Sequence, residues 1–354
     1  MSVEVGLARA ALIGRFFAGR AREIDCTNAS VRDGLLFLRD HQVLSDNLGG
    51  GTPHGITAIA EVIRTVAELC VSSAFSLWCH RMVMEYVHRT DPATFPRDDW
   101  ARRLGDVRTL GSTALGTAMA HLVGAGPLPM TIRASNGSLV VNGRVPWASN
   151  LFPPEMLVIT AGVNDAGGKY VVAVPGDTPG LSIDPYPELL ALQATGSSSL
   201  RLNDVEIPRD HVLSTEFTSF LRSVRPTFLL LQTALCVGLS TAALRAARKA
   251  IGGINVVFEE SLQAAEARLH DVESRWRGWL ATPNASIVPM RGFVQLRLDA
   301  ALLAGEATRV EAVVTGGRGY VTRSDTARRI REAAFLPVQA PTEGQLRWEL
   351  SRSA

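Results

Sequence analysis

Apolar positions recur every three or four residues through the first 110 positions, which predicts a series of amphipathic helices. The pattern is clear on one face of residues 1–22 and again over residues 56–69. Residues 73–88 are apolar almost all round, which predicts a helix buried on every side. We therefore expect an N-terminal helical domain over residues 1–110.

The period changes to two at about residue 111, and short apolar runs alternate with polar turns. Asn136-Gly137 stands between two such runs and predicts a tight hairpin, because this pair readily adopts positive φ. Further strands are expected over residues 156–160, 169–175 and 200–208. Several short strands of this kind predict a small barrel or sandwich, and we expect a central β-barrel domain over residues 111–215.

Helical periodicity returns after residue 216 and continues to the end. Long periodic segments separated by glycine or proline predict antiparallel helices, over residues 227–251, 256–280 and 290–315. Gly316 follows the last of these and is expected to end it, because glycine tolerates a left-handed C-cap. The prediction is a C-terminal four-helix bundle over residues 216–354, in a chain of the α+β class.

Composition excludes several classes of protein. Of the 354 residues, 46% are hydrophobic, which supports a large core rather than a disordered chain. The most apolar stretch, 228–239, is too short to span a membrane and contains Gln232 and Thr233, so we expect a buried helix. The formal net charge is +2 without any basic block, so neither nucleic acid nor a membrane is an expected partner.

The spacings of cysteine and histidine bear on whether the chain forms disulfides or binds a metal. The four cysteines show no paired spacing, which favours a reduced, cytoplasmic protein. The seven histidines lack the spacing of metal ligands, so no metal site is expected.

Four short motifs, in this order of helices, strands and helices, resemble the acyl-CoA dehydrogenase superfamily of flavoproteins. They are Val145-Pro-Trp-Ala-Ser-Asn150, Asn203-Asp-Val-Glu-Ile-Pro208, Gly316-Gly-Arg-Gly-Tyr320 and Thr342-Glu-Gly344. Each motif alone is weak, but their combined order and spacing cover nearly the whole chain. The resemblance implies FAD, or alternatively FMN, as cofactor and a homodimer or homotetramer as the assembly.

The resemblance also assigns residues to the cofactor. Trp147 would lie against the isoalloxazine ring, and the Ser149 hydroxyl would hydrogen-bond the flavin near N5. Thr117 is matched to the family's flavin-binding segment, and Gly344 accompanies the C-terminal motif. The alternative interpretation of Trp147 is packing at the end of a strand.

Three further residues are matched to a cofactor shared between subunits. Arg248, in Arg248-Lys-Ala-Ile-Gly252, would reach the FAD pyrophosphate of a neighbouring subunit, because a guanidinium fork suits phosphate oxygens. The backbone of Gly316 and Gly317 would lie close to the partner's FAD, because glycine has no β-carbon to prevent the contact. The alternatives are a solvated arginine and a plain helix cap.

Glu343 is the candidate catalytic base. The family's dehydrogenases place a glutamate here to remove the α-proton of a fatty acyl thioester, and hydride then passes from Cβ to flavin N5. The alternative is an ordinary helix start, since Pro341-Thr-Glu-Gly344 also has the composition of a turn.

The chain departs from the family pattern at several positions. Gly111-Ser-Thr-Ala-Leu-Gly-Thr117 replaces the usual Thr-Glu-Pro-Gly segment, and Val313 and Ile251 replace an expected Gln and Phe. Thr195-Gly-Ser197 resembles reduced-flavin-dependent monooxygenases built on the same fold, in which His121 could be an acid or base.

We therefore carry three hypotheses. The leading one is FAD-dependent α,β-dehydrogenation of an acyl thioester bound to CoA or a carrier protein, with an electron acceptor as partner. The second is monooxygenation of an aromatic or heterocyclic substrate, supplied by a flavin reductase. The third is a non-catalytic relative with a decayed flavin site.

Overall fold

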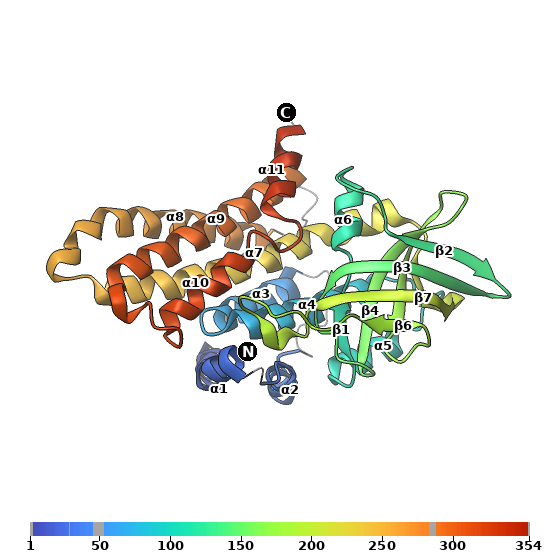
Figure 1. Cartoon of the computed structure of the whole chain (residues 1–354), viewed down its shortest axis with the longest axis horizontal. Helices are drawn as coiled ribbons and strands as arrows, with labels where there is room; N and C mark the ends of the chain where they lie inside the picture. Colours follow the sequence, from blue (N-terminus) through green and yellow to red (C-terminus); the bar gives the residue numbers. More distant parts are fainter. Residues whose placement is uncertain (1–2, 28, 45–52, 283–287, 353–354) are drawn as a thin grey trace.

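The computed structural model describes residues 3–27, 29–44, 53–282 and 288–352. Helices occupy both ends of the chain and one sheet lies between them in sequence. Figure 1 shows the long C-terminal helices side by side at one end of the molecule and the sheet at the other, with the N-terminal helices beneath them. The predicted order of N-terminal helices, central strands and C-terminal helices is confirmed.

The N-terminal helices follow the predicted pattern closely. They are α1 (Val3–Thr27), α2 (Arg32–Asp40), α3 (Pro53–Ala67), α4 (Val71–His88) and α5 (Arg97–Gly105). Every residue of α4 from Val71 to Val87 is buried, as its all-round apolar pattern predicts. The glycine run at positions 49–51 lies outside the described residues.

The central strands form one sheet with the order β6-β7-β3-β2-β4-β5-β8, and β1 pairs in parallel with β4. The predicted hairpin joins β2 and β3, with Asn136 at φ 41° and Gly137 at φ 88°. The bounds are β1 (Leu110–Thr113), β2 (Met130–Ser135), β3 (Ser138–Ala148), β4 (Met156–Val163), β5 (Lys169–Pro175), β6 (Leu181–Ile183), β7 (Ser198–Pro208) and β8 (Val212–Ser214); α6 (Gly116–Leu122) follows β1.

The expected barrel is instead a sheet that does not close over the described residues. Its two end strands, β6 and β8, pair with β7 and β5 respectively, and not with each other. Each is only three residues long, so the sheet ends in short strands on both sides. One face of the sheet still encloses its own core, in which Val141, Val158, Leu200 and Val205 are fully buried.

The C-terminal helices are α7 (Phe217–Ala250), α8 (Glu259–Leu280), α9 (Met290–Thr315), α10 (Asp325–Phe335) and α11 (Glu343–Arg352). α7 begins ten residues before the predicted start and contains Pro226. By length and composition alone α7 could cross a membrane, yet 94% of its most apolar window is buried within the fold. It is the central helix of the bundle.

One hydrophobic core joins the two helical regions. It contains Ile59 and Ile63 of α3, Trp78 of α4, Leu231 of α7 and Leu296 of α9. The bundle therefore packs directly on the N-terminal helices, and the boundaries of the three domains stay a prediction.

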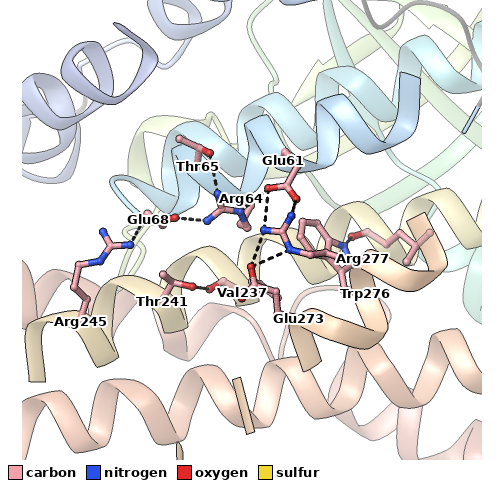
Figure 2. Close-up of polar contacts among 11 residues, drawn as sticks. Glu61, Arg64, Thr65, Glu68, Val237, Thr241, Arg245, Glu273, Trp276 and Arg277 are labelled. Carbon is pink, nitrogen blue, oxygen red and sulfur yellow. Dashed lines mark hydrogen bonds and ion pairs between the residues drawn. The ribbon is translucent and has the colours of Figure 1, made fainter. Parts of the chain in front are cut away.

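A line of ion pairs, here named the charged seam, crosses α3, α7 and α8 beside this core (Figure 2). Arg64 Nε lies 2.8 Å from a carboxylate oxygen of Glu61, and Arg245 NH2 lies 2.7 Å from Glu68. Both glutamates also bind a second arginine, so the pairs form a chain rather than isolated contacts. The members are Glu61, Arg64, Glu68, Arg245, Glu273 and Arg277.

Candidate functional site

A cavity of about 610 Å³ lies where the end of β3 meets α4, α7, α10 and the segment before β7. Its walls are mainly apolar, and no carboxylate lines it among the described residues. Aromatic rings, small polar groups and one arginine are among its lining residues, which include Phe75, Trp78, Cys79, Thr113, Gly116, Trp147, Ser149, Ser197, Phe228, Arg331, Phe335, Gln339 and Thr342. Pockets of this size and character bind small organic ligands.

Trp147 and Ser149 both line this cavity, at the C-terminal end of β3. The Trp147 side chain is 62% exposed, while Ser149 is buried. The strand is irregular here: its register with β7 shifts between Val145 and Ala148, it ends at Ala148, and Ala148 lines the cavity as well. The structure thus brings together the indole and the hydroxyl that the sequence motif singled out.

Residues 150–151, just after β3, are held against residues 195–196, just before β7, by two backbone hydrogen bonds. The Asn150 N–H donates to the Thr195 carbonyl at 2.8 Å, and the Leu151 N–H donates to the Gly196 carbonyl at 3.1 Å. This places Ser197 beside Ser149, with their hydroxyl oxygens 2.6 Å apart. A second hydroxyl therefore stands behind the predicted flavin ligand.

Buried polar contacts hold this strand end against α4. The Asn150 amide accepts from the Ser76 hydroxyl at 2.7 Å and donates to the Ser76 and Gly111 carbonyls at 2.9 and 3.0 Å. His80 accepts from the Gly111 N–H at its Nδ1, and its Nε2–H donates to the Leu104 carbonyl. Burial lowers the pKa of His80 to about 4, so a neutral imidazole is part of this support.

The opposite wall, residues 336–342, rests on a buried arginine. Arg297 of α9 is fully buried, and it donates to the Leu336 carbonyl at 2.7 Å and to Gln232 and Gln339 at 3.3 Å each. Gln232 in turn donates to the Ala340 carbonyl at 2.9 Å. Among the described residues, no carboxylate pairs with Arg297. Its charge instead faces the carboxyl end of α10, where the helix dipole is negative.

Glu343 follows the lining residue Thr342 but does not itself line the cavity. Its carboxylate lies 2.8 Å from Nε of Arg347, one turn along α11, and its side chain is one-third exposed. Gly344 occupies the next position of α11 and does not line the cavity either. The structure therefore brings the candidate base to the edge of the site without directing it inward.

The predicted pyrophosphate residues do not line this cavity. Arg248 lies in the last turn of α7, and Gly316 and Gly317 directly follow α9. Figure 1 shows these ends of α7 and α9 at the end of the bundle away from the sheet. Arg248 forms ion pairs with Glu259 and with Glu266, the latter at 2.5 Å, and these hydrogen bonds raise its pKa. Gly316 has a φ of 64°, which favours glycine.

Two further candidates stand beside the cavity rather than in its wall. Thr117 is half-buried, next to the lining residue Gly116 on α6. His121, one turn later, has its Nδ1 2.9 Å from the Gly126 carbonyl and does not line the cavity.

The cavity fits a flavin ring by two observations. Planar side chains offer flat apolar walls, and two lining residues carry buried donors without a hydrogen-bond partner, namely Trp78 Nε1 and Gln339 Nε2. Buried donors are almost always paired, so unpaired ones beside a cavity suit a ligand rich in acceptors. These lining residues were not predicted as site residues; the helical spacing of Phe75, Trp78 and Cys79 indicated a shared face but not a cavity.

No protein-family model matches the chain, but curated proteins and solved structures do. It is 26% identical over 241 residues to the probable acyl-CoA dehydrogenase YngJ of Bacillus subtilis, covering 62% of each chain. It is 26% identical over 242 residues to the human mitochondrial short-chain specific acyl-CoA dehydrogenase, covering 62% of this chain and 56% of that one. The matched part thus spans less than two thirds of either relative.

Solved structures show the same fold over the whole chain. The glutaryl-coenzyme A dehydrogenase glutaryl-CoA complex superposes with a TM-score of 0.85 at 16% identity, covering 99% of this chain and 95% of that one. A nitrososynthase from Micromonospora carbonacea var. africana superposes with a TM-score of 0.77 at 16% identity, covering 97% and 94%.

Proposed function

Because the chain belongs to the acyl-CoA dehydrogenase superfamily, we propose that it is an FAD-dependent oxidoreductase that introduces an α,β double bond into an acyl thioester. The observation that carries this proposal is the cavity that unites Trp147 and Ser149 with the aromatic face of α4. It supplies a flat wall, a hydroxyl and unpaired donors in one apolar space. FAD, when bound there, would supply the acceptor for the two electrons removed from the substrate.

The chain's own residues would divide the remaining work. Trp147 would cover one face of the flavin ring, and Ser149 would hydrogen-bond its edge. Glu343 would take the proton from the substrate Cα, after its side chain turns from Arg347 toward the adjacent Thr342. The apolar walls would exclude water, which strengthens the interactions of the charges left inside.

The first test is titration of the protein with FAD, followed by anaerobic addition of acyl thioesters. Binding should shift the flavin absorption bands and quench tryptophan fluorescence, and a suitable thioester should bleach the bound flavin. Trp147→Ala should weaken FAD binding by roughly tenfold, whereas Trp147→Phe keeps a flat ring and should keep most of the affinity.

Glu343→Gln tests the base. The substitution keeps the shape of the side chain but removes its basic charge, so FAD affinity should persist while thioester-driven bleaching slows by roughly 10²–10⁴-fold. Glu188→Gln, which alters an exposed carboxylate beside the cavity residue Leu189, is the matched control. Unchanged bleaching in Glu343→Gln would remove Glu343 from this role.

Self-association is part of the proposal. Ile254, Val257 and Tyr320 are 88%, 75% and 90% exposed, and they lie in the turns that follow α7 and α9, near Arg248 and Gly316. A second copy would cover these apolar side chains and complete a shared cofactor site as a homodimer or homotetramer. A monomer at every concentration in light scattering would contradict this arrangement.

Two observations favour reduced-flavin-dependent monooxygenation as a second candidate. The Glu343 carboxylate is directed away from the cavity, and Ser197 of Thr195-Gly-Ser197 lines it. In that case thioesters would not bleach bound flavin, and turnover would need oxygen and a flavin reductase. Failure to bind FAD or FMN at tens of micromolar would instead support a non-catalytic relative.

A further inference from the structure

We propose that Ser149, Ser197 and Thr195 form a reversible chain of hydroxyl groups that offers the cavity either a hydrogen-bond donor or an acceptor at Ser149. The chain would thereby serve a flavin in both its oxidised and its reduced state. This inference rests on the proposed binding of FAD in the cavity, and it assigns a role to two residues behind the expected ligand.

The three hydroxyls stand in a row that leads away from the cavity. Ser149 Oγ and Ser197 Oγ are 2.6 Å apart, and Ser197 Oγ and Thr195 Oγ1 are 2.7 Å apart. Thr195 is fully buried, and its Oγ1 lies 2.7 Å from the Leu192 carbonyl oxygen. Ser149 and Ser197 line the cavity, so one end of the row meets a ligand and the other ends at a backbone acceptor.

Counting hydrogens gives the first arrangement. Each hydroxyl has one hydrogen to donate. If Thr195 donates to the Leu192 carbonyl, Ser197 must donate to Thr195, and Ser149 must donate to Ser197. The hydrogen of Ser149 is then used inside the protein, and its oxygen meets the cavity as an acceptor.

The second arrangement reverses every bond. Thr195 donates to Ser197, Ser197 donates to Ser149, and Ser149 donates to the ligand. The Leu192 carbonyl keeps a partner in this arrangement, because it also accepts from the Thr195 N–H at 3.0 Å. No buried group is left without a bond, so both directions suit the same heavy-atom positions. Each hydroxyl only rotates its own hydrogen, and no covalent bond breaks.

A flavin is a ligand that needs this reversal. Its N5 accepts a hydrogen bond when the ring is oxidised, whereas two-electron reduction adds a hydrogen to N5 and makes it a donor. A site with a fixed donor would bind the oxidised flavin well. In the reduced flavin, the hydrogen of that donor would point at the hydrogen on N5. Unpaired buried donors are costly, so the reversible chain would let one serine stabilise both states.

Breaking the chain should penalise the reduced state selectively. Ser197→Ala removes the Ser197 oxygen that accepts the Ser149 hydrogen in the first arrangement. Thr195→Val removes the Thr195 oxygen that accepts the Ser197 hydrogen in the same arrangement. Both substitutions leave a buried hydroxyl hydrogen without an acceptor only when Ser149 accepts a hydrogen bond from the ligand. We therefore expect the affinity for reduced FAD to fall roughly 3- to 10-fold more than that for oxidised FAD.

The experiment measures FAD binding aerobically and after anaerobic reduction with dithionite, together with the midpoint potential of bound FAD. Both variants should shift the potential to more negative values. Ser198→Ala is the matched control, because that neighbouring buried serine donates to the Asp184 carbonyl at 2.9 Å and does not line the cavity. It should leave the potential unchanged.

Two failures are distinguishable. If the wild-type protein binds no flavin, the proposed function fails and this inference falls with it. If the wild type binds FAD but both variants weaken its two states equally, with no shift in potential, the hydroxyls are structural and the inference alone is overturned.

Discussion

Gly238 of α7 packs so closely on Arg64 of α3 that a β-carbon at position 238 would lie 2.3 Å from the Arg64 carbonyl oxygen. The same carbon would lie 2.7 Å from the side chain of Ala67. Neither neighbour is the end of a flexible side chain, so the two helices would have to separate. Glycine at this position therefore sets the distance between the N-terminal helices and the bundle.

Gly238→Ala should destabilise the protein by about 2 kcal/mol, because overpacking outweighs the better helix propensity of alanine. Urea unfolding followed by tryptophan fluorescence would measure this change. Gly305→Ala on α9 is the control: its β-carbon would meet no atom within 4 Å, and it should stabilise the protein by about 0.5–1 kcal/mol. Equal stability of the two variants would contradict the close helix contact.

His80 predicts a pH dependence of stability. Its pKa falls from 6.5 to about 4 on folding, because burial disfavours the imidazolium. Below pH 6.5 the unfolded chain takes up a proton that the folded chain does not, so stability is lost as the pH falls toward 4. At 1.36 kcal/mol per pKa unit the loss is about 3 kcal/mol.

Unfolding free energies at pH 7 and pH 4 would test this dependence. His80→Gln should lose the slope that His80 contributes between the two values, although it is less stable at both. His88→Gln, at the exposed end of the same helix, should keep the wild-type slope. A slope unaffected by His80→Gln would exclude His80 as its source.

We expect Arg297 to stabilise the cavity wall formed by residues 336–342. Arg297→Met removes the N–H groups that donate to the oxygens of Leu336, Gln232 and Gln339. We expect this substitution to lower the free energy of unfolding by about 3 kcal/mol. Arg297→Lys should rescue little, because one ammonium cannot replace a fork that reaches several acceptors. Hydrogen exchange of residues 336–342 should rise in both variants, and protection equal to wild type would show that Arg297 does not hold this wall in place.

Phosphates of the cofactor would compete with protein carboxylates for the guanidinium group of Arg248. If it binds the FAD pyrophosphate of a neighbouring subunit, Arg248→Ala should weaken FAD binding about tenfold and leave riboflavin binding unchanged. Glu266→Gln should strengthen FAD binding, because it removes the carboxylate that lies 2.5 Å from the guanidinium. Equal effects on FAD and riboflavin would assign Arg248 a structural role.

The fold follows from local patterns that need no tertiary information. Asn136-Gly137 specifies its hairpin, and the all-round apolar pattern of α4 specifies its burial. Closure of the sheet could not be predicted, since it depends on whether three-residue strands such as β6 find a second partner. The ten extra residues at the start of α7 are supported by tertiary packing, since Phe217 contacts His121 of α6 and Phe220 contacts Tyr86 of α4.

The site was predictable only where residues lie in one short motif. Trp147 and Ser149 are two residues apart at the end of β3, so the chain itself keeps them close together, and both line the cavity. Phe75 of α4, Arg297 of α9 and Gln339 of the segment after α10 are far apart in the chain, and no local pattern joins them. Whether Glu343 points inward depends on its competition with Arg347, which spacing alone does not decide.

The shared core of α3, α4 and α7 also has a consequence for synthesis on the ribosome. The apolar face of α3, including Ile59 and Ile63, is covered by a helix that ends at Ala250. At about 5–20 residues per second, the ribosome needs roughly ten to thirty seconds between finishing α4 and finishing α7. Throughout that interval the N-terminal helices carry an uncovered hydrophobic surface, which we expect chaperones to bind.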